Sequence, residues 1–132
     1  MIAKSLLGTT LTSSIDTHSR LKDLHDHFGM TDDIVSRLAI AYSLNQGPVE
    51  SDWTVSPYEG VHKIVTGKSI RGQTMFKEDL ALWLVLMAIH EPGITEDQIR
   101  MKFIQHWERG VQLLAEELNH EDWIETIEGM IQ

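Results

Sequence analysis

Ten residues near the middle of the chain, Gly67–Phe76 (GKSIRGQTMF), combine basic side chains with glycines in a way that suits contact with phosphate. Gly67 and Gly72 bracket the run, and glycine lets another backbone or a phosphate approach closely. Lys68 supplies a mobile point charge, and Arg71 supplies a fork that can grip a phosphate. Nothing in the run would read base edges, so it predicts a phosphate-backbone contact without sequence specificity. A surface turn with incidental charges is the alternative.

The charge of the chain is distributed unevenly. The 132 residues carry a formal net charge of −9, which by itself argues against binding a polyphosphate. Residues 1–77 hold eight basic and eight acidic side chains, whereas residues 78–132 hold three basic and twelve acidic ones. The segment Gly60–Lys77 contains no acid, so Lys63 and Lys77 join Lys68 and Arg71 as candidate phosphate contacts. The acidic second part is interpreted as solvated helix surface.

No set of residues in the sequence specifies catalysis. The chain has no cysteine, which excludes thiolate nucleophiles and cysteine-bound metal centres. Gly67–Ser69 (GKS) resembles the end of a phosphate-binding loop, but no glycine stands five residues upstream of Gly67 as that loop requires. The seven histidines show no known ligand spacing, and His90 and His106, in the most apolar segments, are interpreted as hydrogen-bonded core residues. We expect no catalytic residue, no metal site and no cofactor.

Hydrophobic periodicity predicts a mainly α fold with about five helices in one domain. The first expected helix ends at Phe28 before a cap at Gly29, and the second is capped by Thr31 and reaches Leu44. The third is Glu78–His90. The fourth begins at a Thr95–Gln98 capping box and reaches Leu118, and the fifth is Glu121–Met130. A short strand is expected over Leu6–Ser13. This strand and the two helices that follow it also match the ribbon-helix-helix layout, which we keep only as an alternative dimer topology.

Residues 45–77 are expected to form irregular chain with a small hairpin. Asn45–Asp52 has the composition of a loop. Three short runs of β-type residues follow, Trp53–Val55, Val61–Thr66 and Gln73–Phe76, and glycine and proline interrupt them. A hairpin formed by these runs would turn near Gly67–Lys68.

Glu78–His90 is apolar almost all round, which predicts a buried central helix. It is too short to span a bilayer, for which ~20 residues are needed. The first twenty residues have neither a long apolar core nor a small-residue cleavage site. Together with the lack of cysteine, these features lead us to expect a cytoplasmic protein.

Three segments of the sequence resemble the DndE family of DNA sulfur modification proteins. They are Ser36–Leu44 (SRLAIAYSL), Gly67–Phe76 with the apolar segment after it, and Phe103–Ala115 (FIQHWERGVQLLA), and the similarity extends over about Ile15–Leu118. The resemblance implies a role in DNA phosphorothioation, in which sulfur replaces a non-bridging oxygen of the DNA backbone. It also implies a small helical subunit without a catalytic centre. Such a subunit works with a cysteine desulfurase, a sulfurtransferase-type ATPase and an SMC-like ATPase.

The family resemblance further implies a homo-oligomer, expected to be a tetramer, that binds double-stranded DNA and prefers nicked duplex. Carried over to this sequence, Lys68 and Arg71 are the leading DNA contacts, followed by Lys63 and Lys77. Arg20, Lys22 and Arg37 are weaker candidates. The expected single domain divides into a strand and helical hairpin (1–44), a loop or hairpin with the basic turn (45–77) and an acidic helical part (78–132).

Two other functions remain open from the sequence. The acidic helices and four tryptophans would suit an adaptor that assembles a modification complex through protein contacts and does not touch DNA. An enzyme such as a nuclease or a phosphatase ranks third. Replacement of Arg71 by Glu discriminates the first two readings, because it should abolish DNA binding and leave partner assembly intact.

Overall fold

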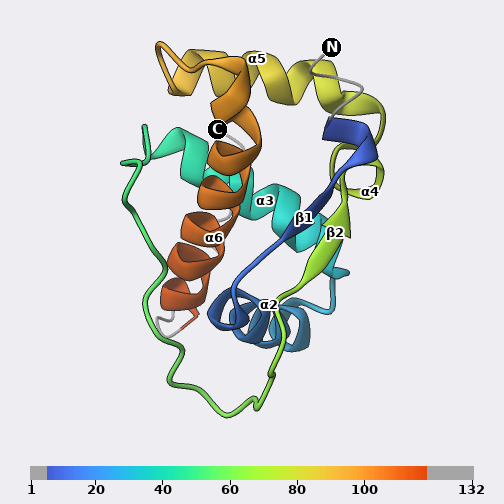
Figure 1. Cartoon of the computed structure of the whole chain (residues 1–132). Helices are drawn as coiled ribbons and strands as arrows, with labels where there is room; N and C mark the ends of the chain where they lie inside the picture. Colours follow the sequence, from blue (N-terminus) through green and yellow to red (C-terminus); the bar gives the residue numbers. More distant parts are fainter. Residues whose placement is uncertain (1–5, 119–132) are drawn as a thin grey trace.

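A computed structural model describes residues 6–118 of the chain (Figure 1). The described part is mainly helical, as predicted. Its elements are, in order, β1 (Thr10–Thr12), α2 (Ile15–Phe28), α3 (Asp32–Asn45), β2 (Ser69–Arg71), α4 (Gly72–Phe76), α5 (Leu80–His90) and α6 (Ile99–Glu117), with short 3-10 turns at Lys77–Asp79 and Glu96–Gln98. The expected helix Glu121–Met130 lies outside the described residues.

The helical hairpin of α2 and α3 forms as the sequence predicted. Gly29 ends α2 in the left-handed conformation with a φ of 70°, which a residue without a Cβ adopts at little cost. Thr31 occupies the N-cap of α3, but its hydroxyl donates to the carboxylate of Asp33 at 2.6 Å and caps no backbone group. The predicted capping box of Thr95 and Gln98 is present before α6.

Helices α3 and α6 pack against each other at the centre of the molecule (Figure 1). Gly110 of α6 lies so close to the carbonyl of Ala39 that a Cβ would collide with it. Trp107 is fully buried, and its indole N–H donates to the hydroxyl of Ser36 at 2.8 Å. The period of three and four in α6 therefore correctly predicted its buried face, formed by Ile99, Phe103, Trp107, Val111 and Leu114.

The two strands form a sheet that the sequence did not predict. Ser69–Arg71 pairs antiparallel with Thr10–Thr12, so the expected hairpin within residues 53–76 is wrong. Gln73–Phe76, expected as β-type chain, lies in α4, and Leu6–Gly8 is helical, so the first strand is shorter than predicted. Because β1 pairs with a strand of its own chain, it differs from the ribbon-helix-helix arrangement, in which strands of two chains pair.

Helix α5 is not the buried central helix that its composition predicted. It lies across one end of the molecule, at the top of Figure 1. Leu80, Trp83 and Met87 face the core, whereas Leu82 and Val85 on the opposite side are more than half exposed. Among the described residues, no helix combines the length and the apolarity that a membrane span requires.

A long irregular segment between α3 and β2 runs along the outside of α6 and then beneath α2 (Figure 1). Side chains of α6 hold its first half: Lys102 donates to the carbonyl of Val49, and Arg109 donates to the carbonyl of Pro48 at 3.1 Å. Arg20 of α2 holds its second half by donating to the carbonyl of Ser56 at 2.7 Å. The segment has almost no secondary structure of its own, so these bonds fix its path.

Candidate nucleic-acid interface

The basic motif lines an open groove of about 500 Å³ at the meeting point of α2, α3 and β2. Its lining residues are Lys22 and His25 from α2, Thr31, Asp32 and Asp33 from the start of α3, and Lys68, Ser69, Ile70, Arg71 and Thr74 from the motif. Three cations and two carboxylates therefore share the groove. The structure thus brings Lys68 and Arg71 of the predicted site together and places Lys22 beside them.

Carboxylates at the start of α3 neutralise part of the groove. The ammonium of Lys68 lies 3.0 Å from the carboxylate of Asp32. Asp33 lies 3.4 Å from Arg37 and 3.9 Å from Lys77. The hydrogen bond from Thr31 lowers the pKa of Asp33, burial opposes this shift, and the charge of Arg37 reinforces it. Asp33 is therefore ionised at neutral pH, and a phosphate entering the groove would compete with carboxylates for its cations.

Arg71 is the cation of the motif that remains most available. The alternation along β2 buries Ile70 and exposes Ser69 and Arg71 on the same side of the strand. The ion pairs formed among residues 6–118 include Lys68 and Lys77 but not Arg71. An exposed guanidinium held on a strand can turn its donor fork toward a phosphate oxygen pair.

The two glycines of the motif serve backbone packing, whereas the sequence suggested room for a phosphate. A Cβ on Gly67 would collide with the carbonyl of Ser13, and a Cβ on Gly72 would collide with that of Leu6. At the same two places Ser13 N–H donates to the carbonyl of Lys68, and Gly72 N–H donates to that of Thr9, both at 2.8 Å. The glycines thus fix both ends of the basic turn against the N-terminal segment.

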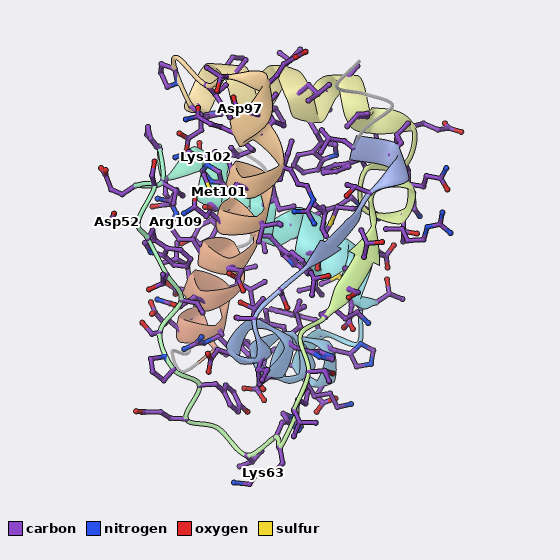
Figure 2. The ribbon with its side chains drawn as sticks, viewed as in Figure 1. Asp52, Lys63, Asp97, Met101, Lys102 and Arg109 are labelled. Carbon is purple, nitrogen blue, oxygen red and sulfur yellow. The ribbon has the colours of Figure 1, made fainter. Side chains whose placement is uncertain are left out.

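Apart from Lys22, the other predicted contacts lie outside the groove lining. Lys77 lies near the edge of the groove, where it faces the carboxylate of Asp33. Lys63 is exposed and lies far from β2, at the tip of the long segment (Figure 2). Of the weaker candidates, Arg20 is bonded to loop carbonyls, and Arg37 donates to the carbonyl of Thr74 at 3.1 Å. Only Lys22, paired with Asp26 at 3.3 Å, lines the groove.

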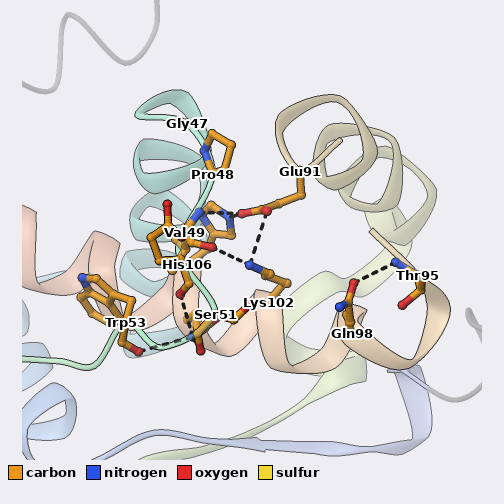
Figure 3. A network of polar contacts seen from close by, with 12 residues as sticks. Gly47, Pro48, Val49, Ser51, Trp53, Glu91, Thr95, Gln98, Lys102 and His106 are labelled. Carbon is orange, nitrogen blue, oxygen red and sulfur yellow. Dashed lines mark hydrogen bonds and ion pairs between the residues drawn. The ribbon is translucent and has the colours of Figure 1, made fainter. Parts of the chain in front are cut away.

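A second polar cluster lies in the interior between α3, α5 and α6 (Figure 3). His106 contacts the hydroxyl of Ser43 through Nδ1 at 2.8 Å and the carboxylate of Glu91 through Nε2 at 2.7 Å. Glu91 also accepts from the backbone N–H of Val49 at 2.8 Å and lies 3.5 Å from the ammonium of Lys102. A serine, a histidine and a carboxylate in line resemble a hydrolytic triad.

The burial of this cluster assigns it to the fold. Ser43 and His106 are fully buried, and the Ser43 oxygen also accepts from Arg109 at 2.8 Å, so a substrate has no path to it. Burial lowers the pKa of His106 to about 4, which keeps the ring neutral. Burial raises the pKa of Glu91, but the hydrogen bonds from Val49 and His106 and the charge of Lys102 lower it further than burial raises it. The ionised carboxylate fastens the long segment to α6.

Among residues 6–118, no three histidine, aspartate or glutamate side chains are arranged to hold a metal ion. The candidate site is defined by the cations that line the groove, and comparison with known proteins gives it a context. The family model of DNA sulphur modification protein DndE matches residues 11–122. The chain belongs to the DndE family.

Among solved structures, the fold is similar to that of DndE from Escherichia coli B7A, a protein involved in DNA phosphorothioation modification. The match has a TM-score of 0.57 and 23% sequence identity, and covers 82% of this chain and 97% of the other. No curated protein matches the chain. The structural likeness supports the DndE fold, and the family model supports membership.

Sequence reasoning missed the acidic residues of the groove. By their sequence position, Asp32 and Asp33 suit the first turn of α3, where the helix dipole favours negative charge. Their pairing with Lys68 and Lys77 depends on β2 lying against the start of α3, which no local pattern in the sequence indicated. A segment that contains no acidic residue, such as Gly60–Lys77, can still have carboxylates from other segments beside it once the chain has folded.

Proposed function

We propose that this DndE-family protein is a non-catalytic subunit of a cytoplasmic DNA phosphorothioation system that binds duplex DNA through the phosphate backbone. The observation that carries the proposal is the convergence of Lys22, Lys68 and Arg71 on one open groove. Each of these cations can replace a counterion of DNA, so binding should be sensitive to salt and indifferent to sequence.

The mixed charge of the groove suggests how affinity is obtained. Three cations facing two carboxylates give one chain only a weak attraction for phosphate. A homotetramer would present four such grooves to one duplex, and linked weak contacts bind far more tightly than single ones. A nicked duplex bends more easily than an intact one, so it would reach several grooves at a lower deformation cost. We therefore propose a tetramer that prefers nicked DNA.

The test is fluorescence anisotropy of labelled nicked and intact duplexes of one sequence, at two salt concentrations, with the oligomeric state recorded in the same buffer. The wild type should bind more weakly at the higher salt concentration and favour the nick. The double variant Lys68→Ala/Arg71→Ala should lose most binding to both duplexes. Each lost phosphate contact should reduce the salt slope by about one unit.

Matched variants separate charge from structure. Lys68→Arg/Arg71→Lys keeps both charges and should retain most of the affinity. Lys63→Ala, at the tip of the long segment, tests whether contact extends beyond the groove. Arg71→Glu should abolish DNA binding and leave assembly with other subunits intact. A folded wild-type oligomer that binds neither duplex would reject DNA recognition by this protein alone and favour the adaptor role.

A further inference from the structure

Helix α5 has two apolar faces, and among the described residues 6–118 only one of them is covered. Leu80, Trp83 and Met87 face the core. On the other side Leu82, Val85 and Ile89 are 57%, 55% and 62% exposed. Both stripes have the spacing of three and four residues that lets one helix pack against another.

The exposed stripe is long enough to receive a helix. Ala81 and Ala88 flank it and are also exposed, so that a partner backbone could approach α5 closely. Soluble proteins rarely expose a contiguous apolar stripe without a use, and such stripes mark interaction sites. Residues in the same helix thus bind the core on one side and remain available on the other.

Acidic residues border the stripe where α5 begins. Glu78 and Asp79 directly precede α5 and are exposed. Glu96 and Asp97, also exposed, lie at the same end of the molecule as α5 (Figure 2).

Among residues 6–118, the neighbouring cations are engaged elsewhere, so they leave this border negative. Lys77 faces Asp33, 3.9 Å away. Arg100 donates to the hydroxyl of Thr9 at 3.2 Å and to the carbonyl of Thr10 at 2.7 Å. An occupant of the stripe therefore meets the exposed carboxylates of Glu78 and Asp79 where α5 begins.

The charge of the molecule disfavours a second copy of the chain as the occupant. If two copies met through α5 in parallel, Glu78 and Asp79 of one would face the same residues of the other, and like charges placed opposite each other across an interface cost free energy. In any arrangement, two chains that each carry a net charge of −9 repel each other.

We propose that the exposed face of α5 is a docking site for an amphipathic helix of a partner protein, one whose apolar stripe is bordered by lysine or arginine. Its apolar residues would cover Leu82, Val85 and Ile89, and its cations would meet Glu78 and Asp79. The site lies apart from the basic groove and does not depend on DNA binding. The same subunit can therefore hold a protein on α5 while its groove faces DNA.

The test uses a defined probe, a labelled helical peptide of leucine and lysine with all leucines on one face. Two control peptides accompany it, one with glutamate in place of lysine and one with the same composition in scrambled order. Anisotropy should show binding of the first peptide only. Val85→Asp should weaken this binding by about tenfold or more, the scale expected for a central interface residue.

The matched control is Val65→Asp, which makes the same change at a valine that is 80% exposed in the long segment. It should leave peptide binding unchanged. Glu78→Gln/Asp79→Asn should weaken binding and reduce its salt dependence. Ile89→Asp provides a second variant on the same face if Val85→Asp does not fold, as judged by circular dichroism.

Three results would overturn the proposal. The first is equal binding of the lysine peptide and the scrambled peptide, which would reveal attraction by net charge alone. The second is no binding of either. The third is loss of self-association in Val85→Asp but not in Val65→Asp, measured by light scattering, which would assign the face to a second copy. Loss of DNA binding in the groove variants would not affect any of these readouts.

Discussion

Two sets of ion pairs in this protein differ in burial, and the difference separates structural charges from available ones. In the interior, the Lys102 and Glu91 side chains are 9% and 7% exposed, and His106 is fully buried beside them. In the groove, the Lys68 and Asp32 side chains are 30% and 26% exposed. A buried pair cannot exchange partners without unfolding its surroundings, whereas an exposed cation can leave its carboxylate for a phosphate.

The largest effect should come from breaking the interior set. Glu91→Ala would leave the ammonium of Lys102 and the N–H of Val49 buried without their partner, which should cost about 3–5 kcal/mol. Urea denaturation of this variant measures the cost as a change in the free energy of unfolding. Asp32→Ala is the matched change in the groove and should cost less than about 1 kcal/mol. Equal losses in the two variants would contradict the distinction drawn above.

The second-largest effect should come from acid, which weakens the buried contacts of His106 and Glu91. The pKa of His106 is about 4 in the folded chain against 6.5 in an unperturbed histidine, so the unfolded chain binds more protons between these values. Stability should therefore fall as the pH falls from about 6.5 to 4, by at most about 1.4 kcal/mol per pH unit for this proton. The lowered pKa of Glu91 adds a loss at lower pH, as the carboxylate becomes protonated. Urea titrations at several pH values measure the slope, and His106→Asn should flatten it above pH 4.

A change in the ion pair of Lys68 and Asp32 should alter DNA affinity more than it alters the stability of the fold. Asp32→Asn removes the carboxylate that holds Lys68 and frees that cation for phosphate. Affinity for duplex DNA should rise several-fold, and the salt slope should increase by up to about one unit. Anisotropy titrations at two salt concentrations measure both quantities. Unchanged or weaker binding would mean that Asp32 positions Lys68 for DNA and does not compete with it.

The smallest effect is expected at the edge of the groove. The Lys77 side chain is 58% exposed and 3.9 Å from Asp33, a distance at which an exposed pair contributes little. Lys77→Ala should change the unfolding free energy by less than about 0.5 kcal/mol and should lower DNA affinity less than Arg71→Ala does. A greater loss of affinity for Lys77→Ala would extend the interface toward α4.

Local patterns predicted the helices well because capping and periodicity depend on near neighbours. Gly29 and the Thr95–Gln98 capping box mark real helix ends, and α6 buries the face that its period indicated. The same reasoning failed for α5, because a helix that is apolar all round gives the same pattern whether both faces or one face meets protein.

Pairings between distant segments could not be predicted from local patterns. The partner of Ser69–Arg71 is Thr10–Thr12, almost sixty residues away, and short strands carry no mark of their partner. The sequence therefore predicted only the cations of the candidate site, which follow from the composition of the motif. Its carboxylates could not be predicted, because they lie there only when β1 pairs with β2. The role of Gly67 and Gly72 also depended on that pairing, because the backbone they touch belongs to residues 6–13.

The closure of the basic turn on the N-terminal segment has a kinetic consequence. Thr12 and Ser69, whose hydroxyls lie 3.0 Å apart, are separated by 57 positions in the chain. Contacts that close so long a loop form late, because the entropy of closure must be overcome before they contribute. During folding each helix can form from contacts between near neighbours, whereas Lys68 and Arg71 reach their places only when β1 pairs with β2. The basic groove would then be absent from partly folded chains, so that under the proposed function only a fully folded subunit would bind DNA.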